Sequence, residues 1–229
     1  MQLFYSNQIN DDIIILSEDE AKHCIKSVRK EAGDEIRVVD GNGNLYITEL
    51  IATDKKICEL RVKETTKELG KRTNYVHIAI APTKNLSRIE WFVEKAIEIG
   101  VDEISFIDCE KSERNIVKLK RIERIAISAM KQSIKAYLPK INDMQSFSTL
   151  ISNCTEGNKF IGYLGEKCRT LSSIKPINTC MLIGPEGDFT KNEISNAEKY
   201  GFEIVSLGDR RLRTETAGIV SCMILNDSE

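Results

Sequence analysis

The sequence predicts an α/β protein in which a parallel, helix-covered sheet follows a small, mostly β domain. From residue 75 onward, short apolar segments alternate with helical patterns, which is the rhythm of a parallel sheet with helices on both faces. Before residue 70, β-branched segments separated by turn signals dominate. We therefore expect one domain over residues 1–70 and another over residues 71–229, joined near a polar linker at residues 67–74.

The small domain is expected to contain one short helix and at least three strands. Ser17 and Glu20 have the spacing of a capping box, which predicts a helix that ends near residue 28. Strands are expected over residues 35–40, 45–53 and 57–66. Small β-barrels of this kind often bind RNA.

The larger domain is expected to alternate strands and helices to its end. Ile89, Phe92 and Val93 lie at helical spacing, which predicts a helix with one apolar face. Pro139 is expected to end the longest helix. The expected strands cover residues 75–81, 103–107, 159–164, 179–183 and 203–207, and the expected helices cover residues 86–99, 117–136, 190–201 and 214–225.

Composition places the 229-residue chain among ordinary globular proteins. Hydrophobic residues make up 41% and charged residues 30%, which argues against disorder and against a fibre. No apolar run reaches the 18 or more residues of a membrane span, so no membrane partner is expected. The first residues lack the pattern of an export signal, and we expect a cytoplasmic protein.

The seven cysteines do not have the spacing of a metal site. No two are fewer than twelve positions apart, whereas structural zinc sites use pairs such as C-x2-C. The sequence therefore predicts reduced cysteines and no metal.

Positive charge is concentrated in one part of the chain. The net charge is −2, but residues 111–140 hold nine basic residues and two acidic ones, a local charge of +7. Such a segment can present a positive face to phosphates in an otherwise acidic protein. The candidate RNA contacts are Arg114, Arg121, Arg124 and Lys135, helped by Lys26 and Arg29 of the small domain.

Two loops after consecutive expected strands carry unusual residues. In open α/β sheets, ligands bind beyond the carboxyl ends of the strands. Residues 184–190 contain two glycines and a proline, and residues 208–217 contain three arginines, one glutamate and two threonines. No P-loop, dinucleotide-binding glycine motif or G-x-S-x-G elbow is present, so those common nucleotide and hydrolase sites are excluded.

These two loops, in residues 182–187 and 207–217, resemble the signature loops of the ribosomal RNA small subunit methyltransferase E family. The resemblance continues in the same order over nearly the whole chain. Asp188 departs from it, since many members carry glycine there. The further similar segments are residues 23–29, 33–35, 88–91, 95–101, 112–114 and 129–133.

The resemblance implies an enzyme of the SPOUT superfamily that methylates N3 of one uridine in 16S ribosomal RNA. It implies S-adenosylmethionine as donor, no metal, a PUA-like N-terminal domain, a trefoil-knotted C-terminal domain and a homodimer. Two alternatives stay open at this point. One is a non-catalytic RNA-binding or assembly factor, and the other is a methyltransferase that acts on another RNA, such as transfer RNA.

The same resemblance suggests roles for individual residues. Arg213 is expected to stabilise the uridinate, and Glu215 to accept the proton or to orient Arg213. Arg88 and Gln132 are expected to join the RNA-binding residues. The expected donor-binding residues are Leu164, Gly165, Ile183, Gly184, Glu186, Gly187, Leu207, Gly208, Leu212 and Thr216.

Overall fold

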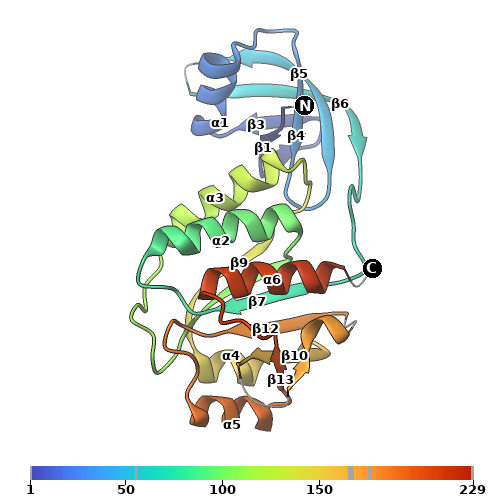
Figure 1. The fold of residues 1–229 in the computed structure, drawn as a ribbon. Helices are drawn as coiled ribbons and strands as arrows, with labels where there is room; N and C mark the ends of the chain where they lie inside the picture. Colours follow the sequence, from blue (N-terminus) through green and yellow to red (C-terminus); the bar gives the residue numbers. More distant parts are fainter. Residues whose placement is uncertain (1, 55, 165–167, 175–176, 228–229) are drawn as a thin grey trace. The chain divides into compact units, whose positions relative to one another are not determined.

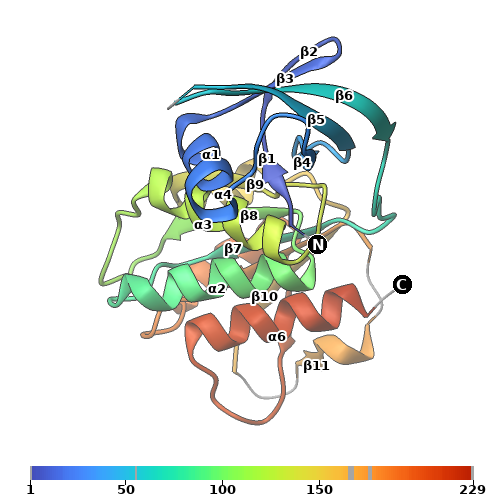
Figure 2. The ribbon, with the colours of Figure 1, turned by 90° about the horizontal axis from the view of Figure 1, so that it is seen from above.

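The computed structural model describes residues 2–54, 56–164, 168–174 and 177–227. The chain divides into two compact units (Figures 1 and 2). The first comprises Met1–Lys71 with Ile127–Leu138, and the second comprises Arg72–Ala126 with Pro139–Glu229. Within the described residues, no helix has the length and apolar character that crossing a membrane requires.

The first unit is built on a six-stranded sheet with the order β1-β4-β5-β6-β3-β2. Its pairs are antiparallel except for β1 with β4. Ile14, Leu50 and Leu60 are fully buried and form part of its core. The elements are β1 Phe4–Tyr5, β2 Gln8–Asn10, β3 Ile13–Leu16, α1 Glu18–Lys22 continued by a π-helix at His23–Val28, β4 Glu35–Val39, β5 Leu45–Thr53 and β6 Cys58–Thr66.

The expected helix and three strands of this unit are confirmed, and strands β1 to β3 were missed. These three strands have two to four residues each, too short for an alternating pattern to be recognised. Of the two hydrogen bonds in the predicted capping box of Ser17 and Glu20, only one forms. Ser17 accepts a hydrogen bond from the Glu20 amide, but the Glu20 carboxylate accepts from the Tyr5 amide and from Lys131.

The second unit is built on a seven-stranded sheet with the order β11-β13-β10-β12-β7-β8-β9. Every pair in it is parallel, as the alternation of strands and helices predicts. The strands are β7 Val76–Ile80, β8 Glu103–Asp108, β9 Lys140–Ser146, β10 Asn158–Gly162, β11 Arg169–Thr170, β12 Thr179–Ile183 and β13 Glu203–Ser206.

Helices cover both faces of this sheet (Figure 1). α4 and α5 pack on the face that buries Ala79, Cys180 and Leu182. α2 and α6 lie side by side on the other face, and Gly218 permits their close approach, because a Cβ there would lie 2.5 Å from the Phe92 ring. The helices are α2 Leu86–Ile99, α3 Leu119–Gln132, α4 Phe147–Asn153, α5 Lys191–Lys199, α6 Thr214–Asn226 and a 3-10 turn at Leu171–Ser173.

The expectation that Pro139 ends the longest helix is wrong. α3 already ends at Gln132, and Ile134 has a left-handed φ of 56° that no helix continues through. The residues after Pro139 form β9 and α4, which the sequence did not indicate, since β9 is a polar strand at the sheet edge.

Candidate functional site

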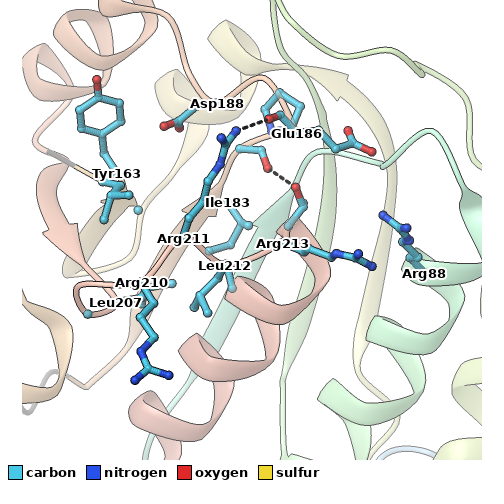
Figure 3. A pocket seen from close by; sticks show the side chains of 17 residues that line it. Arg88, Tyr163, Ile183, Glu186, Asp188, Leu207, Arg210, Arg211, Leu212 and Arg213 are labelled. Carbon is cyan, nitrogen blue, oxygen red and sulfur yellow. Dashed lines mark hydrogen bonds between the residues drawn. The ribbon is translucent and has the colours of Figure 1, made fainter.

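A cavity of about 580 Å³ lies at the carboxyl ends of β10, β12 and β13, three neighbouring strands of the parallel sheet (Figure 3). Its walls are the segments that follow these strands. Arg88 of α2 and Ala217 of α6 complete the lining. The volume is in the range of cavities that hold nucleotide-sized ligands. The two glycine-containing loops singled out in the sequence therefore meet at one site.

Hydrogen bonds hold these loops in place. Thr214 Oγ1 donates to the Gly184 carbonyl at 3.0 Å, which fastens the start of α6 to the loop after β12 (Figure 3). Arg211 Nη2 donates to the Glu186 carbonyl at 3.4 Å. The Glu186 carboxylate accepts from the Lys84 amide at 3.0 Å. The loops are therefore tied to one another and to the segment before α2, which fixes the shape of the cavity.

Glycine occupies these loop positions for different structural reasons. Gly208 has a φ of 120°, which a residue with a Cβ rarely adopts. Gly184 and Gly187 have no such φ, and a Cβ at these positions would meet the Phe189 ring at 3.1 Å and Lys111 at 3.0 Å. A side chain at either position would therefore crowd its neighbour within the protein.

Asp188, the residue at which the loop departs from the expected pattern, has a left-handed φ of 61°. Aspartate tolerates this left-handed conformation better than most residues, because its side chain bonds to nearby backbone. Here Oδ1 accepts from the Phe189 amide at 2.8 Å. Burial raises the pKa of this carboxyl, while the Phe189 hydrogen bond acts in the opposite direction. Asp188 therefore adopts the left-handed conformation that this loop requires and adds a carboxylate to the cavity wall.

Two guanidinium groups lie on one side of the cavity. Figure 3 shows Arg213, from the start of α6, and Arg88, from α2, pointing toward the same region. Arg213 is the N-cap residue of α6, and its side chain makes no hydrogen bond to any residue that the structure describes. The positive end of the α6 dipole reinforces these cations. This region of the cavity is suited to stabilising a developing negative charge.

Glu215 does not line the cavity. It is 7% exposed, and its Oε1 lies 3.7 Å from Arg88 Nε. Its other oxygen has no hydrogen-bond partner among the described residues. Of the two roles expected for Glu215, this position favours orienting an arginine, and the arginine it contacts is Arg88 instead of Arg213.

The structure brings most of the expected donor-binding residues to this cavity. Gly187 and Thr216 are the exceptions among the described residues, and Gly165 lies outside the described ranges. Eight further described residues that line the cavity were missed, and most of them adjoin an expected residue in the sequence. They are Gly162, Tyr163, Pro185, Asp188, Arg210, Arg211, Thr214 and Ala217. The expected residues that do line it are Leu164, Ile183, Gly184, Glu186, Leu207, Gly208 and Leu212.

The basic segment at residues 111–140 is divided between the two units. Arg121 pairs with Glu90, and Lys131 pairs with Glu20, so neither charge is freely available. Lys111 donates a hydrogen bond to the Gly187 carbonyl. In the described part of the second unit, the exposed cations of this segment without an ion pair or such a hydrogen bond are Arg114, Lys118, Lys120 and Arg124.

The first unit holds the other expected RNA contacts. Lys26, Arg29 and Gln132 are exposed, and Lys135 is partly buried. Gln132 also lines a second cavity of about 570 Å³ with His23 and Ser128. These residues are separate from the strand-end cavity, which belongs to the second unit.

Comparisons with known proteins identify both parts of the chain. An RNA methyltransferase domain model matches residues 71–226, and an RNA methyltransferase PUA domain model matches residues 16–63. The chain is 32% identical to a ribosomal RNA small subunit methyltransferase E from Mesomycoplasma hyopneumoniae, covering 96% of each chain. It is 31% identical to the protein of that name from Aquifex aeolicus, covering 98% of this chain and 99% of the relative.

Solved structures agree with this result. A probable rRNA methyltransferase from Porphyromonas gingivalis is 41% identical, with a TM-score of 0.90 and coverage of 97% of this chain and 95% of that one. A putative methyltransferase from Legionella pneumophila, solved with the bound cofactor SAM, is 25% identical, with a TM-score of 0.88 and coverage of 99% and 97%.

Proposed function

Because the chain belongs to the ribosomal RNA small subunit methyltransferase E family, we propose that it transfers a methyl group from S-adenosylmethionine to N3 of one uridine in 16S ribosomal RNA. The observation that carries this proposal is the cavity in which three strand-end loops meet beside Arg213 and Arg88. Its partner is the small ribosomal subunit, and its place of action is the cytoplasm.

The cavity fits the donor chemically. S-adenosylmethionine combines an adenosine with a cationic sulfonium and an amino-acid tail, and it supplies the methyl group as an electrophile. Ile183, Leu207 and Leu212 offer apolar walls to the adenine, and the backbone of the glycine-containing loops offers hydrogen-bonding groups. Asp188 adds a carboxylate to a wall that receives a cationic ligand. None of these contacts requires a metal.

The acceptor base imposes a second requirement. Uridine N3 carries a proton and lies on the Watson–Crick edge, so the base must be unpaired before the enzyme can reach it. Loss of the proton leaves negative charge on the ring, and a guanidinium near its oxygens stabilises that charge. Arg213 serves this role in the proposal, with Arg88 beside it. Glu215, which lies outside the cavity, positions Arg88.

Mapping of modified nucleosides tests the proposed function. Small subunits from a strain that lacks this gene should lack one N3-methyluridine, and the purified chain with S-adenosylmethionine should restore it. Calorimetry on the same protein measures donor binding. A chain that binds no donor would be a non-catalytic RNA-binding factor, and methylation of transfer RNA alone would identify the other alternative.

For the two domains, we assign residues 1–70 to a PUA-like RNA-binding domain and residues 71–229 to the methyltransferase domain. Lys26 and Arg29 are the proposed phosphate contacts of the first. In the second, membership of the family leads us to expect the knotted SPOUT arrangement. The segment Ile127–Leu138 packs with the first unit, so the two domains are not separable at a single point in the sequence.

A homodimer is also part of the proposal, and the apolar character of α6 supports it. Met223 on α6 is 55% exposed, and Trp91 on the neighbouring α2 is 46% exposed. A helix that is apolar on most faces is normally covered. We propose that a second copy of the chain covers these helices.

Met223→Glu should therefore shift the chain toward monomer. Placing a charge in an apolar interface costs about 2 kcal/mol or more, which raises the dimer dissociation constant by roughly 30-fold. Sedimentation velocity over a concentration series measures this constant. Ile57→Glu is the matched control, because Ile57 is 45% exposed in the other unit. An unchanged constant for Met223→Glu would place the interface elsewhere.

The exposed cations of α3 should give salt-dependent RNA binding. The plot of log affinity against log salt has a negative slope, and each lost phosphate contact makes it less steep by about 0.7 to 0.9. The double variant Lys120→Ala/Arg124→Ala should thus reduce the slope by roughly 1.4 to 1.8. Filter binding to a 16S RNA fragment measures it. The control variant Lys191→Ala/Lys199→Ala removes two exposed charges from α5. Equal slopes in the α3 variant and the unmodified chain would show that these cations face solvent in the complex.

A further inference from the structure

A second group of chemically reactive side chains lies at the amino ends of the central strands of the parallel sheet. His77 is near the start of β7, Cys180 is near the start of β12, and Glu156 shortly precedes β10. Their ligand atoms all lie within 4.8 Å of one another. Because the strands are parallel, the amino ends that carry these residues are remote from the cavity at the carboxyl ends. The proposed methyl transfer therefore does not use this group.

The contacts within the group are close. His77 Nδ1 lies 2.5 Å from Glu156 Oε1. Cys154, which follows α4, donates from Sγ to Glu156 Oε2 at 3.1 Å. His77 and Cys180 are buried, and Glu156 is partly buried. One nitrogen, one carboxylate and one sulfur thus converge in a protected place, and a second sulfur, that of Cys154, contacts the carboxylate.

The far side of the His77 ring is fixed by a separate set of partners. Nε2 lies 2.8 Å from Ser105 Oγ and 3.9 Å from Glu103 Oε1. Asn142 Nδ2 donates to both Ser105 and Glu103. Metal-binding histidines commonly donate their second ring N–H to an oxygen in this way, which fixes the tautomer and the ring orientation. The arrangement leaves Nδ1 directed at Glu156 and the thiols.

We propose that His77, Glu156 and Cys180 bind a zinc ion, with Cys154 as the fourth ligand. Zinc prefers four ligands of these types in a tetrahedral arrangement. On binding, both thiols release their protons to solvent, and neutral His77 binds through Nδ1 while its Nε2–H donates a hydrogen bond to Ser105 Oγ. Zinc–ligand bonds of about 2.0 to 2.1 Å place a tetrahedral nitrogen and oxygen about 3.3 Å apart, so His77 and Glu156 must separate slightly.

The ligand spacing explains why the sequence predicts no metal. Pairs such as C-x2-C bring ligands together within one turn, whereas here residues 77, 156 and 180 meet because β10, β12 and β7 are neighbours in the sheet. An ion held by them would link the starts of these strands. Its role would be structural, since four protein ligands leave no open position for substrate.

The experiment uses the full-length chain purified without chelator, followed by titration with zinc and with cobalt. Elemental analysis should give one zinc per chain. Cobalt should produce the visible bands of a tetrahedral site and the near-ultraviolet absorption of cobalt–thiolate bonds. Zinc should also raise the melting temperature, because the ligands come together only in the folded chain and zinc therefore binds the folded state in preference to the unfolded state.

The variants Cys180→Ser and Glu156→Gln should each weaken zinc binding at least tenfold and reduce the cobalt absorption. Glu156→Gln keeps a hydrogen-bond acceptor for His77, so it should fold even if Cys180→Ser does not. Cys222→Ser, a buried cysteine of α6 outside the group, is the control and should bind zinc normally. The proposal is overturned if the unmodified chain binds no stoichiometric metal, or if its affinity persists in both variants. Neither outcome bears on methyl transfer, which is measured separately.

Discussion

Replacing Arg213 with alanine should lower the single-turnover rate of methyl transfer by about two to three powers of ten. The side chain lines the cavity from the N-cap of α6, and its guanidinium is not bound to another described residue. It is therefore available to the acceptor base. An interaction that forms with the developing uridinate affects the transition state more than the bound ground state, so donor affinity should change little. Single-turnover methyl transfer to small subunits, quenched at successive times, measures the rate. Calorimetry measures donor affinity.

Two further results would support this role for Arg213. Arg213→Lys should recover only part of the rate, because a point charge does not replace a planar guanidinium. Higher pH should partly rescue the alanine variant, since solvent then ionises more of the uridine. Arg210→Ala is the control, because Arg210 also lines the cavity but extends to a different side (Figure 3). A near-normal rate, or a defect confined to donor or RNA affinity, would make Arg213 a binding residue.

Local sequence patterns predict the elements of this fold well where the pattern is long. The helix α2 begins and ends at the expected residues, and Thr190 and Glu193 form the full capping box that begins α5. The patterns fail where tertiary contacts decide. α3 ends before Pro139, and its last residues pack with the first unit, which no property of residues 127–138 alone indicates.

The candidate site was predictable to the extent that its residues follow strands. Loops after parallel strands meet at one edge, so the residues after β12 and β13 could be placed together from the sequence. The partner of Glu215 could not, because Arg88 is far away in the sequence and meets it only where α2 packs against α6. The same limit applies to His77 and Cys180, whose contact depends on strand order.

Glu215→Gln should lower the methyl-transfer rate by about tenfold to a hundredfold, with donor affinity unchanged. The glutamine keeps the volume of the buried side chain but loses the charge that holds Arg88 at 3.7 Å. A displacement of the Arg88 guanidinium by about 1 Å can lower the methyl-transfer rate by up to a hundredfold. This loss of rate comes from the Arg88–Glu215 interaction, so a change in either residue should cause it. Arg88→Ala should thus slow the reaction by a similar factor. Glu123→Gln, on the exposed side of α3, is the control.

A double-variant comparison separates the two roles of Glu215. If Glu215 acts through Arg88, the variant Arg88→Ala/Glu215→Gln should be no slower than Arg88→Ala alone. In the double variant the guanidinium that Glu215 positions is already absent, so the loss of the Glu215 charge has no further effect. If Glu215 is instead the general base, the losses should multiply. Glu215→Gln should then lower the rate by about two to four powers of ten and abolish the acidic limb of the pH–rate profile. Since Glu215 is buried, lies outside the cavity and contacts Arg88, we expect the pH profile to keep its shape and the two losses not to multiply.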